Sequence, residues 1–378
     1  MTSKNPRVLV LTRDFPPHKG GGVRRMGALV QGLSKLGFEP IVIASTGDPT
    51  TRYDSTAARF RAGAKSVKLG RAYRALVPWL EVPDEHVVDL PQILWAGSDV
   101  RPDLVLASSP PYSMLLAGTL LAKRHGCPFV ADFRDPWIDY PYLAAPTPIH
   151  RFLHQTLEWR LVTSASAVLC ATERMTTAMA RRARPDLKVR SFFNGYDPEL
   201  FVHSYSPTPG KITVGFYGSI YDPIDPEPLV RAVVKAGARL EHAGDDFDGT
   251  LARAVKKYGA ELSSLGFVTQ AESVERMQRA DVLAVVLPDD PVYGYWRTQK
   301  LPEYLASGRP VLGLLPEGEA RELIERYDAG ISVSPEDADG AARAISALAQ
   351  RREARPMPED LTWSYQIARV AELLRSLL

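Results

Sequence analysis

A lysine and a glutamate three residues apart, Lys300 and Glu303, stand at the start of a short helix-like stretch in the segment RTQKLPEYLASGRPVLG. Pro302 is tolerated only in the first turn of a helix, where the amide that it lacks would have had no partner. Gly308 is a natural left-handed stop, and an apolar strand follows Pro310. The segment therefore predicts a short helix that begins shortly before Pro302 and ends at Gly308.

The start of this helix favours an anion. Its free amides, the positive end of the helix dipole and the ammonium of Lys300 together make a place for a phosphate. Glu303 would then accept hydrogen bonds from neutral hydroxyls beside that phosphate, as in a nucleotide ribose. The alternative is an exposed intrahelical ion pair of Lys300 with Glu303, followed by an ordinary core strand.

Three consecutive glycines, Gly20, Gly21 and Gly22, follow the first apolar strand in the segment DFPPHKGGGVRR. Without side chains they let backbone amides approach a ligand closely, and the helix expected from about Val23 to Leu36 adds its own N-terminus. The spacing is neither the dinucleotide fingerprint nor a P-loop, which disfavours a dehydrogenase or an NTPase. A flexible turn is the alternative.

A second group of polar residues, Asp132, Arg134 and Asp135, lies in ADFRDPW at the end of another apolar strand. The carboxyl ends of parallel strands share one edge of a sheet, so this segment and the glycine loop should face the same site. Charge placed there suits groups that hold a polar substrate or handle a proton, and we take these three as candidate catalytic residues. Helix capping by Asp132 or Asp135 is the alternative.

An acidic run, GDDFDG, places Asp246 and Asp248 at alternate positions, a spacing that could hold a metal diphosphate. The run follows a strand within the second half of the chain and favours a loop and helix cap instead. The seven histidines lie far apart in the sequence, without zinc spacing. We expect no metal and no cofactor.

Length and composition favour a two-domain protein of the cytoplasm. The 378 residues, 45% of them apolar, exceed what one core usually supports, and the formal charge of +2 is too small to imply nucleic acid. The two cysteines, Cys127 and Cys170, lie in or beside apolar strand-like runs, which fits a reducing compartment without a disulfide. No apolar stretch has the length of a membrane span, and the N-terminal apolar run is too short for a signal peptide.

A basic stretch between Arg52 and Arg74 carries seven lysines and arginines against the single acid Asp54, interleaved with Phe60 and Tyr73. It could bind an anionic acceptor or lie on an acidic membrane surface, which would place the protein peripherally at the inner membrane. A solvated face is the commoner explanation.

Apolar strands alternate with helix-like stretches in both halves of the chain. The strands of the first half are RVLVLT, EPIVIAS, DLVLASS, PFVADF and AVLCAT, and those of the second are KITVGFYGSI, ARLEHAG, LSSLGFV, VLAVVLP and RPVLGL. This alternation predicts an α/β protein whose parallel sheets are covered on both faces. A proline- and glycine-rich linker after NGYD separates the halves, which predicts domains at 1–203 and 204–362 and a final helix at 363–378.

Taken together, these segments resemble the family 4 glycosyltransferases of the GT-B fold. FPPHKGGGVRR is similar to the family's first-loop glycine motif, and FFNGYDPELF to its interdomain Asn-Gly-x-Asp followed by Phe. LSSLGFVTQAESVERMQRADVLAVVLP is similar to the segment around the nucleotide base, and KLPEYLASGRPVLGL to a Lys, two residues, Glu-Tyr, then Gly-x-Pro-Val block. The matches run in order from about Val8 to the final helix.

The resemblance implies two Rossmann-like doubly wound parallel-sheet domains that face a central cleft, with the last helix crossing back to the first, acceptor-side domain. It implies a retaining transferase in which Glu303 contacts the donor ribose, while Lys300 and the glycine loop contact the diphosphate. The donor-binding residues expected from the motifs and the resemblance are Gly20, Gly21, Gly22, Gly218, Val268, Arg297, Lys300 and Glu303.

Three positions depart from the family pattern. The residue eight before Glu303, where many members carry a second glutamate, is Tyr295. The His-Asp that many members carry after the fourth strand is Arg134-Asp135 here, and the basic pair expected after Gly218 is absent from GSIYDPID. The charge that binds the phosphates must then come mainly from Lys300, Arg297 or the arginines near the glycine loop.

We therefore expect a hexosyl- or related glycosyltransferase of class EC 2.4, which moves a sugar from a nucleotide-diphosphate donor to an acceptor hydroxyl with retention. The acceptor is a glycan, a lipid-linked intermediate or a small-molecule natural product. Two alternatives stay open: a catalytically silent nucleotide-sugar-binding partner of another transferase, and a nucleotide-sugar epimerase of the same fold.

Overall fold

The computed structural model describes residues 5–18, 20–59, 82–140, 143, 145–203, 206, 209–351 and 355–378. The chain divides into two compact units, one made of Met1–Phe193 with Trp363–Leu378 and the other of Asn194–Thr362. The first unit thus includes the C-terminal helix, and the division between the units falls upstream of the expected one at residue 203.

The first unit is built on seven parallel strands in the order β3-β2-β1-β4-β5-β6-β7. The strands are β1 (Arg7–Leu11), β2 (Glu39–Ala44), β3 (Thr51–Arg52), β4 (Leu104–Ser109), β5 (Phe129–Phe133), β6 (Ala167–Cys170) and β7 (Lys188–Ser191). The central strands β4 and β5 are buried along their whole length, as continuous apolar runs predict for a sheet covered on both faces. The chain changes direction across the sheet between β1 and β4, and this is the switch point where such sheets bind ligands.

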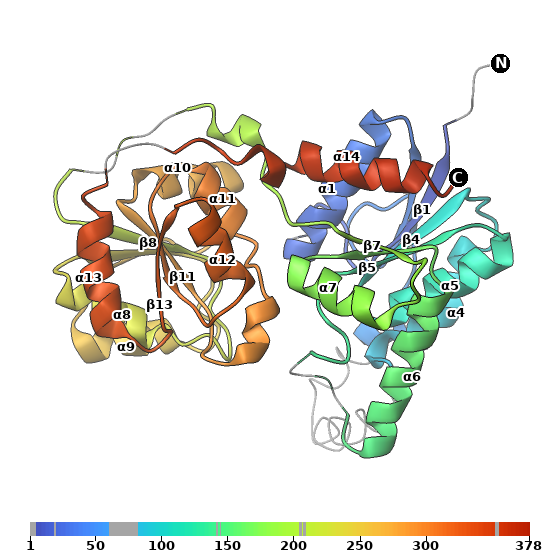
Figure 1. The fold of residues 1–378 in the computed structure, drawn as a ribbon, viewed down its shortest axis with the longest axis horizontal. Coiled ribbons are helices and arrows are strands. Elements are labelled where there is room, and N and C mark those ends of the chain that lie inside the picture. The colour runs from blue at the N-terminus through green and yellow to red at the C-terminus, as the bar shows by residue number, and fades with distance from the viewer. Residues whose placement is uncertain are drawn as a thin grey trace. The chain divides into compact units, whose positions relative to one another are not determined.

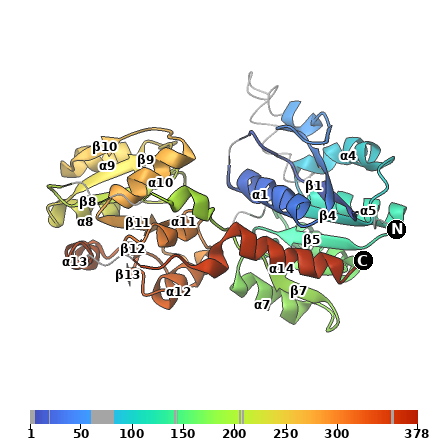
Figure 2. The ribbon, with the colours of Figure 1, turned by 90° about the horizontal axis from the view of Figure 1, so that it is seen from above.

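Helices cover both faces of this sheet (Figure 1). Helix α1 (Gly21–Lys35) and helix α14 (Trp363–Arg375) lie side by side and share one apolar core with alternate residues of β1, β2 and β4 (Figure 2). Helix α5 (Ser113–His125) packs on the opposite face, where Gly118 lies against Ala107 and Phe129. The other helices of the first unit are η1 (Glu85–Asp89), α4 (Leu90–Gly97), α6 (Pro148–Ser164) and α7 (Glu173–Arg182).

The second unit repeats the plan with six parallel strands in the order β10-β9-β8-β11-β12-β13. Its strands are β8 (Thr213–Tyr217), β9 (Arg239–Ala243), β10 (Leu262–Ser264), β11 (Val282–Val286), β12 (Val311–Leu314) and β13 (Gly330–Val333). Its helices are η2 (Pro198–Phe201), α8 (Glu227–Lys235), α9 (Thr250–Tyr258), α10 (Gln270–Arg279), η3 (Pro291–Tyr295), α11 (Leu301–Ala306), α12 (Glu319–Arg326), α13 (Ala338–Leu348) and η4 (Glu359–Leu361). The prediction of two doubly wound parallel sheets is confirmed.

Local boundaries follow the sequence signals closely. The helix expected over Val23–Leu36 spans Gly21–Lys35, so it begins within the glycine run rather than after it. Glycine is tolerated there because the first turn of a helix needs little propensity when tertiary contacts hold it. None of the helices in the described part of the chain has the length and apolar character that crossing a bilayer requires.

Helix α6 turns polar side chains toward the rest of the first unit. Nε1 of Trp137 donates a hydrogen bond to Nδ1 of His154 at 3.1 Å, and Nη1 of Arg182 lies 4.0 Å from the Glu158 carboxylate. Burial raises the pKa of Glu158 to about 7; the positive charge of Arg182 opposes the shift and the negative charge of Asp139 adds to it. Glu158 therefore titrates near neutral pH.

Replacing Glu158 by glutamine should stabilise the protein at pH 8 and have little effect at pH 4.5. The pKa of this carboxyl is about 7 in the folded state against 4.5 for the free group. Its contribution to the free energy of unfolding is fully present below pH about 4.5 and is lost as the pH rises through about 7. A neutral glutamine avoids that loss, which amounts to at most about 3 kcal/mol at pH 8.

Melting temperatures at the two pH values measure this effect. Glu372→Gln, which removes an exposed carboxylate from α14, is the matched control and should give no comparable gain at pH 8. A shift for Glu158→Gln that is equal at both pH values would contradict the assignment.

Candidate functional site

The site of the first unit lies in the loops that follow β1, β2, β4 and β5. These loops meet because the carboxyl ends of parallel strands share one edge. Asp14, after β1, accepts a hydrogen bond from Oγ1 of Thr46, after β2, at 2.9 Å. Arg134, after β5, donates from Nε to the carbonyl oxygen of Ser109, at the end of β4, at 2.9 Å.

A buried ion pair joins the first turns of α1 to β5. Nη2 of Arg25 lies 2.6 Å from Oδ1 of Asp132, and Nε donates to Oδ2 at 3.2 Å. Oγ of Ser108 donates to Oδ2 at 2.7 Å, and the guanidinium of Arg25 stacks on the ring of Phe192, 3.9 Å from its centroid. The side chains of Arg25 and Asp132 are 1% and 0% exposed. Asp132 therefore holds Arg25 in place and caps no helix, so the capping alternative is wrong for this residue.

Arg134 lies against the glycine loop, and both belong to segments that the sequence predicted at the same edge of the sheet. The guanidinium of Arg134 bonds to the carbonyl oxygens of Ser109 and Pro110, and it occupies the space where a side chain at position 22 would stand. A Cβ built on Gly22 would lie 1.3 Å from Nη1 of Arg134. Glycine at this position therefore makes room for a protein cation, in addition to any ligand.

Asp135 follows directly and lies half-buried beside this cation. Burial raises the pKa of the Asp135 carboxyl, while the positive charges of Arg134 and Arg25 oppose the shift. The next residues are held firmly: the Trp137 indole is fully buried and stacks on Tyr112 with ring centroids 4.6 Å apart. The hydroxyl of Tyr112 donates to the carbonyl oxygen of Pro136 at 2.8 Å. The segment ADFRDPW is thus a rigid wall of the site.

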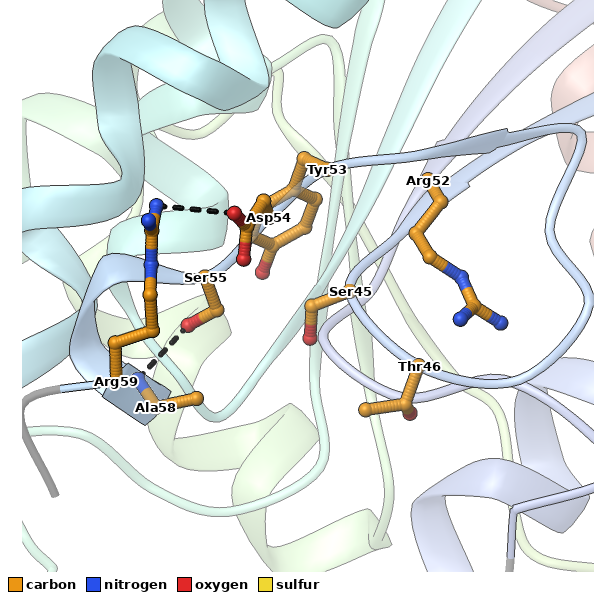
Figure 3. Close-up of a pocket in the computed structure, with 8 residues that line it drawn as sticks. All are labelled: Ser45, Thr46, Arg52, Tyr53, Asp54, Ser55, Ala58 and Arg59. Atoms are coloured by element: carbon orange, nitrogen blue, oxygen red, sulfur yellow. Dashed lines mark hydrogen bonds and ion pairs between the residues drawn. The ribbon is translucent and has the colours of Figure 1, made fainter. Parts of the chain in front are cut away.

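A cavity of about 530 Å³ lies at the ends of β2 and β3 (Figure 3). It is lined by Ser45, Thr46, Arg52, Tyr53, Asp54, Ser55, Ala58 and Arg59. Arg59 pairs with Asp54 at 3.1 Å, and Oγ of Ser55 donates to the buried carboxylate of Asp89 at 2.8 Å. Burial raises the pKa of the Tyr53 hydroxyl, which therefore stays protonated.

This cavity takes in the beginning of the basic stretch that the sequence singled out. Arg52 and Arg59 line it, while residues 60–74 of that stretch lie outside the described part of the chain.

The short helix that carries Lys300 and Glu303 forms as the sequence predicts. Helix α11 spans Leu301–Ala306 with Pro302 in its first turn, and Gly308 has a left-handed φ of 71°. Tyr304 anchors it to the sheet, because its hydroxyl accepts a hydrogen bond from the amide of Tyr217, the last residue of β8, at 2.8 Å. The hydroxyl of Tyr304 is buried, which raises its pKa, so it keeps its proton.

Lys300 and Glu303 form an ion pair in which the carboxylate is buried. Nζ of Lys300 lies 3.0 Å from Oε2 of Glu303, whose side chain is 3% exposed against 24% for Lys300. Nε2 of Gln270, the first residue of α10, donates to Oε1 of Glu303 at 3.2 Å, and Nζ of Lys300 donates to Oγ of Ser273 at 3.3 Å. The alternative of an exposed surface pair is therefore wrong, because α10 covers the carboxylate.

Two further residues of the predicted donor set, Val268 and Gly218, lie in the same unit. Val268 lies two residues before Gln270, whose amide reaches Glu303. Gly218 follows Tyr217, and its carbonyl oxygen lies 2.9 Å from Nε2 of His242. A Cβ built on Gly218 would meet no atom within 4 Å, so this glycine borders open space.

Arg297 has a different environment. It is buried, and burial lowers the pKa of its guanidinium. The charged groups that act on it are Glu319, Asp360 and Arg326, from α12 and η4. Tyr295, which stands where many family 4 members have a glutamate, ends η3 and is partly exposed.

The acidic run in the second unit is a helix cap, as the sequence favoured. Oδ2 of Asp246 accepts from the amide of Ala252 at 3.0 Å, near the start of α9, and Oδ2 of Asp248 accepts from the amide of Asp222 at 3.1 Å. Among the described residues, no group of histidine, cysteine and acidic side chains is arranged to hold a metal ion.

Sequence reasoning missed Gln270, Ser273 and Tyr304 at this site. The capping box formed by Thr269 and Glu272 was a usable signal, because Thr-x-x-Glu before an apolar pattern marks the start of α10. The start of α10 contacts Glu303 of α11, however, and no local sequence pattern identifies that contact.

Two successive doubly wound parallel sheets are the architecture of the GT-B fold, which this chain shares with solved structures. Residues 19–200 match the sequence model of Glycosyltransferase Family 4. The resemblance to family 4 glycosyltransferases is thereby confirmed. No curated protein matches the chain.

Solved structures with this fold cover nearly the whole chain. Sucrose-phosphate synthase from Thermosynechococcus elongatus is 15% identical, with 99% of both chains covered and a TM-score of 0.73. HepE from Anabaena, in complex with UDP and glucose, is 16% identical, with 99% of this chain and 100% of that chain covered and a TM-score of 0.68. WaaG, a glycosyltransferase involved in lipopolysaccharide biosynthesis, is 13% identical, with 98% and 97% covered and a TM-score of 0.61.

Adding a methyl group at position 22 should displace Arg134. We expect Gly22→Ala to lower the free energy of unfolding by about 1–3 kcal/mol, because the guanidinium must leave the carbonyl oxygens of Ser109 and Pro110. Combining Gly22→Ala with Arg134→Ala should remove most of this added cost. Chemical denaturation of the wild type, both single variants and the double variant measures the coupling. Additive effects of the two substitutions would show that the contact is not tight.

Proposed function

We propose that the protein transfers a sugar, of hexosyl or related type, from a nucleotide-diphosphate donor to an acceptor hydroxyl, with retention of configuration at the anomeric carbon. The observation that carries the proposal is the buried carboxylate of Glu303, held by Lys300 and Gln270 at the carboxyl end of the second sheet. A dry carboxylate held by two donors is suited to accept hydrogen bonds from neutral hydroxyls. The family match and the GT-B fold support the same reaction class.

In this proposal the second unit binds the donor. Glu303 accepts hydrogen bonds from the ribose hydroxyls, and the ammonium of Lys300 attracts the diphosphate. Val268 borders the base, while Gly218 leaves room beside the phosphates. Arg297, two residues after η3, contributes positive charge to the same unit. HepE is described in complex with UDP and glucose, which makes UDP the first nucleotide to test.

The first unit supplies the groups around the reacting atoms. In a retaining front-face transfer, the bond from the anomeric carbon to the phosphate oxygen breaks, the bond to the acceptor oxygen forms on the same face, and the leaving phosphate takes the acceptor proton. The protein then has to position the reactants and stabilise charge. Arg134 and the amides of Gly20, Gly21 and Gly22 suit the developing phosphate charge, and Asp135 suits the acceptor hydroxyl.

Asp132 has a positioning role in this scheme. It fixes Arg25 in the buried ion pair and thereby the start of α1, which carries the glycine loop.

We assign the acceptor to the first unit, at the cavity lined by Tyr53, Asp54 and Arg59. Its hydroxyl and charged groups fit a glycan, the sugar part of a lipid-linked intermediate or a polar natural product. The two arginines in its lining favour an acceptor that also carries negative charge.

A catalytically silent nucleotide-sugar-binding partner is the second candidate. Tyr295 favours it, because a tyrosine cannot give the carboxylate contact to donor sugar hydroxyls that a glutamate gives. The Lys300–Glu303 cluster would then bind nucleotide without turnover.

A cytoplasmic location, with peripheral contact at the inner membrane surface, belongs to the same proposal. The two cysteines are free, and Cys170 is buried among apolar residues, which raises the pKa of its thiol. Unreactive, unpaired cysteines fit a reducing compartment.

Replacing Glu303 by glutamine should weaken the binding of UDP by about tenfold or more. The variant keeps one acceptor oxygen but loses the charge that strengthens hydrogen bonds from the ribose hydroxyls. Because the pair with Lys300 is buried, we also expect a lower melting temperature of the unliganded protein. Titration calorimetry at a temperature well below both transitions separates the two effects. Glu325→Gln, an exposed change on α12, is the control, and an unchanged affinity in Glu303→Gln would remove the ribose assignment.

Alanine at Arg134 or asparagine at Asp135 should lower the turnover number by on the order of a hundredfold or more, with nearly unchanged affinity for UDP. The measurement is release of UDP from UDP-glucose and related UDP-sugars in the presence of a panel of glycan, lipid-linked and small-molecule acceptors. Arg181→Ala, an exposed change on α7, should retain turnover. Tight UDP binding by the wild type with no turnover on any acceptor would favour the silent partner instead.

A further inference from the structure

The outward face of α6 is apolar where a surface helix should be polar. Ile149, Phe152, Leu153 and Trp159 are 69%, 64%, 42% and 60% exposed, and their spacing places them on one side of the helix. The inward side of the same turns carries His150, His154 and Glu158, all buried. The usual amphipathic arrangement is therefore reversed over the first three turns, and packing within the described part of the chain gives no reason for large apolar side chains on the outside.

The polar residues on the inward side of α6 make contacts within the first unit. His154 receives the hydrogen bond of the buried Trp137 indole, and Glu158 lies near Arg182. These contacts explain why the inner side is polar. They do not explain why Phe152 and Trp159 are apolar. Polar residues at these two exposed positions would not disturb the core.

The exposed charged side chains on α6 and on the two helices nearest to it, α5 and α4, are all basic. Helix α5 packs between α4 and α6 (Figure 1), and every residue of these three helices is described. Their exposed charged side chains are Lys123, Arg124, Arg151 and Arg160, and none of the exposed ones is acidic. Two further large apolar side chains are exposed on the neighbouring helices, Trp95 on α4 and Leu120 on α5.

This composition fits a lipid surface better than a second copy of the chain. A two-fold interface brings the same patch of both subunits together, which would set these cations against one another. Tryptophan, phenylalanine and leucine beside arginine and lysine are the residues that bury in the headgroup region of a bilayer, where the cations reach acidic phosphates. Acidic lipid adds an attraction of opposite sign to each basic residue near the surface.

We infer that the outward face of α6, with the basic end of α5, docks the protein on a bilayer that contains acidic phospholipid. This gives the proposed membrane contact a place in the fold and a lipid class. It does not depend on the proposed sugar transfer, because vesicle binding needs neither donor nor turnover.

Co-sedimentation with vesicles tests the inference. The full chain should bind vesicles of phosphatidylcholine with about a third phosphatidylglycerol and should bind pure phosphatidylcholine at least about tenfold more weakly. Phe152→Ser combined with Trp159→Ser should reduce the partition coefficient on acidic vesicles by about tenfold or more. Arg151→Glu combined with Arg160→Glu should reduce it by a similar factor, and raised salt should weaken the wild type in the same way.

The controls lie on the second unit. Phe247→Ser removes an equally exposed aromatic side chain, and Lys256→Glu reverses an exposed cation on α9; both should bind acidic vesicles as the wild type does. Circular dichroism and the melting temperature establish that each variant is folded, and retained UDP affinity does so for the second unit.

Three results would overturn the inference. The first is that the wild type does not bind acidic vesicles, and the second is that the Phe152 and Trp159 double variant binds them as strongly as the wild type. The third is that the wild type forms a dimer in sedimentation velocity, that the double variant does not, and that neither protein binds vesicles. The last result would identify the face as a contact between copies of the chain. If the wild type binds acidic vesicles but shows no turnover with any acceptor, the result counts against the transferase proposal alone.

Discussion

The buried ion pair of Arg25 with Asp132 fixes the site of the first unit. Both side chains are withdrawn from solvent, and the pair has two direct contacts, a hydroxyl from Ser108 and the ring of Phe192 around it. Removing one partner of such a pair leaves an uncompensated charge in the core and costs about 3–5 kcal/mol. Because Arg25 belongs to α1 and Asp132 to β5, the pair sets the distance between the glycine loop and Arg134. The contact of Gly22 with Arg134 follows from it.

The second unit also contains a buried carboxylate that is held by donors from neighbouring elements. A carboxylate is again buried beneath donors from neighbouring elements, here Lys300 of the α11 start and Gln270 of the α10 start. Tyr304 then ties α11 to the end of β8. A carboxylate held in this way before any ligand arrives is preorganised, so little ordering is left for binding to provide. In the first unit the partly exposed cation Arg134 is held in the same way, by backbone carbonyl oxygens.

Helix α6 connects the outer surface of the first unit to its site. Its inward residue His154 holds Trp137, which lies two positions after Asp135. Its outward residues form the apolar and basic face for which we infer a lipid surface. A bilayer contact on one side of α6 would therefore act on the helix that supports the wall of the site on the other side. The two polar contacts on the inner side also explain why the helix cannot simply rotate to hide its apolar face.

The sequence by itself determined the features that depend on neighbouring residues. Pro302 and Gly308 restrict the backbone directly, so the short helix between them could be predicted, and the alternation of apolar strands with helices predicted two parallel sheets. Motif order was enough for the family resemblance. Tertiary structure alone decided that Arg25 pairs with Asp132, 107 residues away, and that Gln270 covers Glu303 from 33 residues away. It also decided that α6 turns its apolar side outward, because burial depends on which elements pack together and not on the periodicity of one helix.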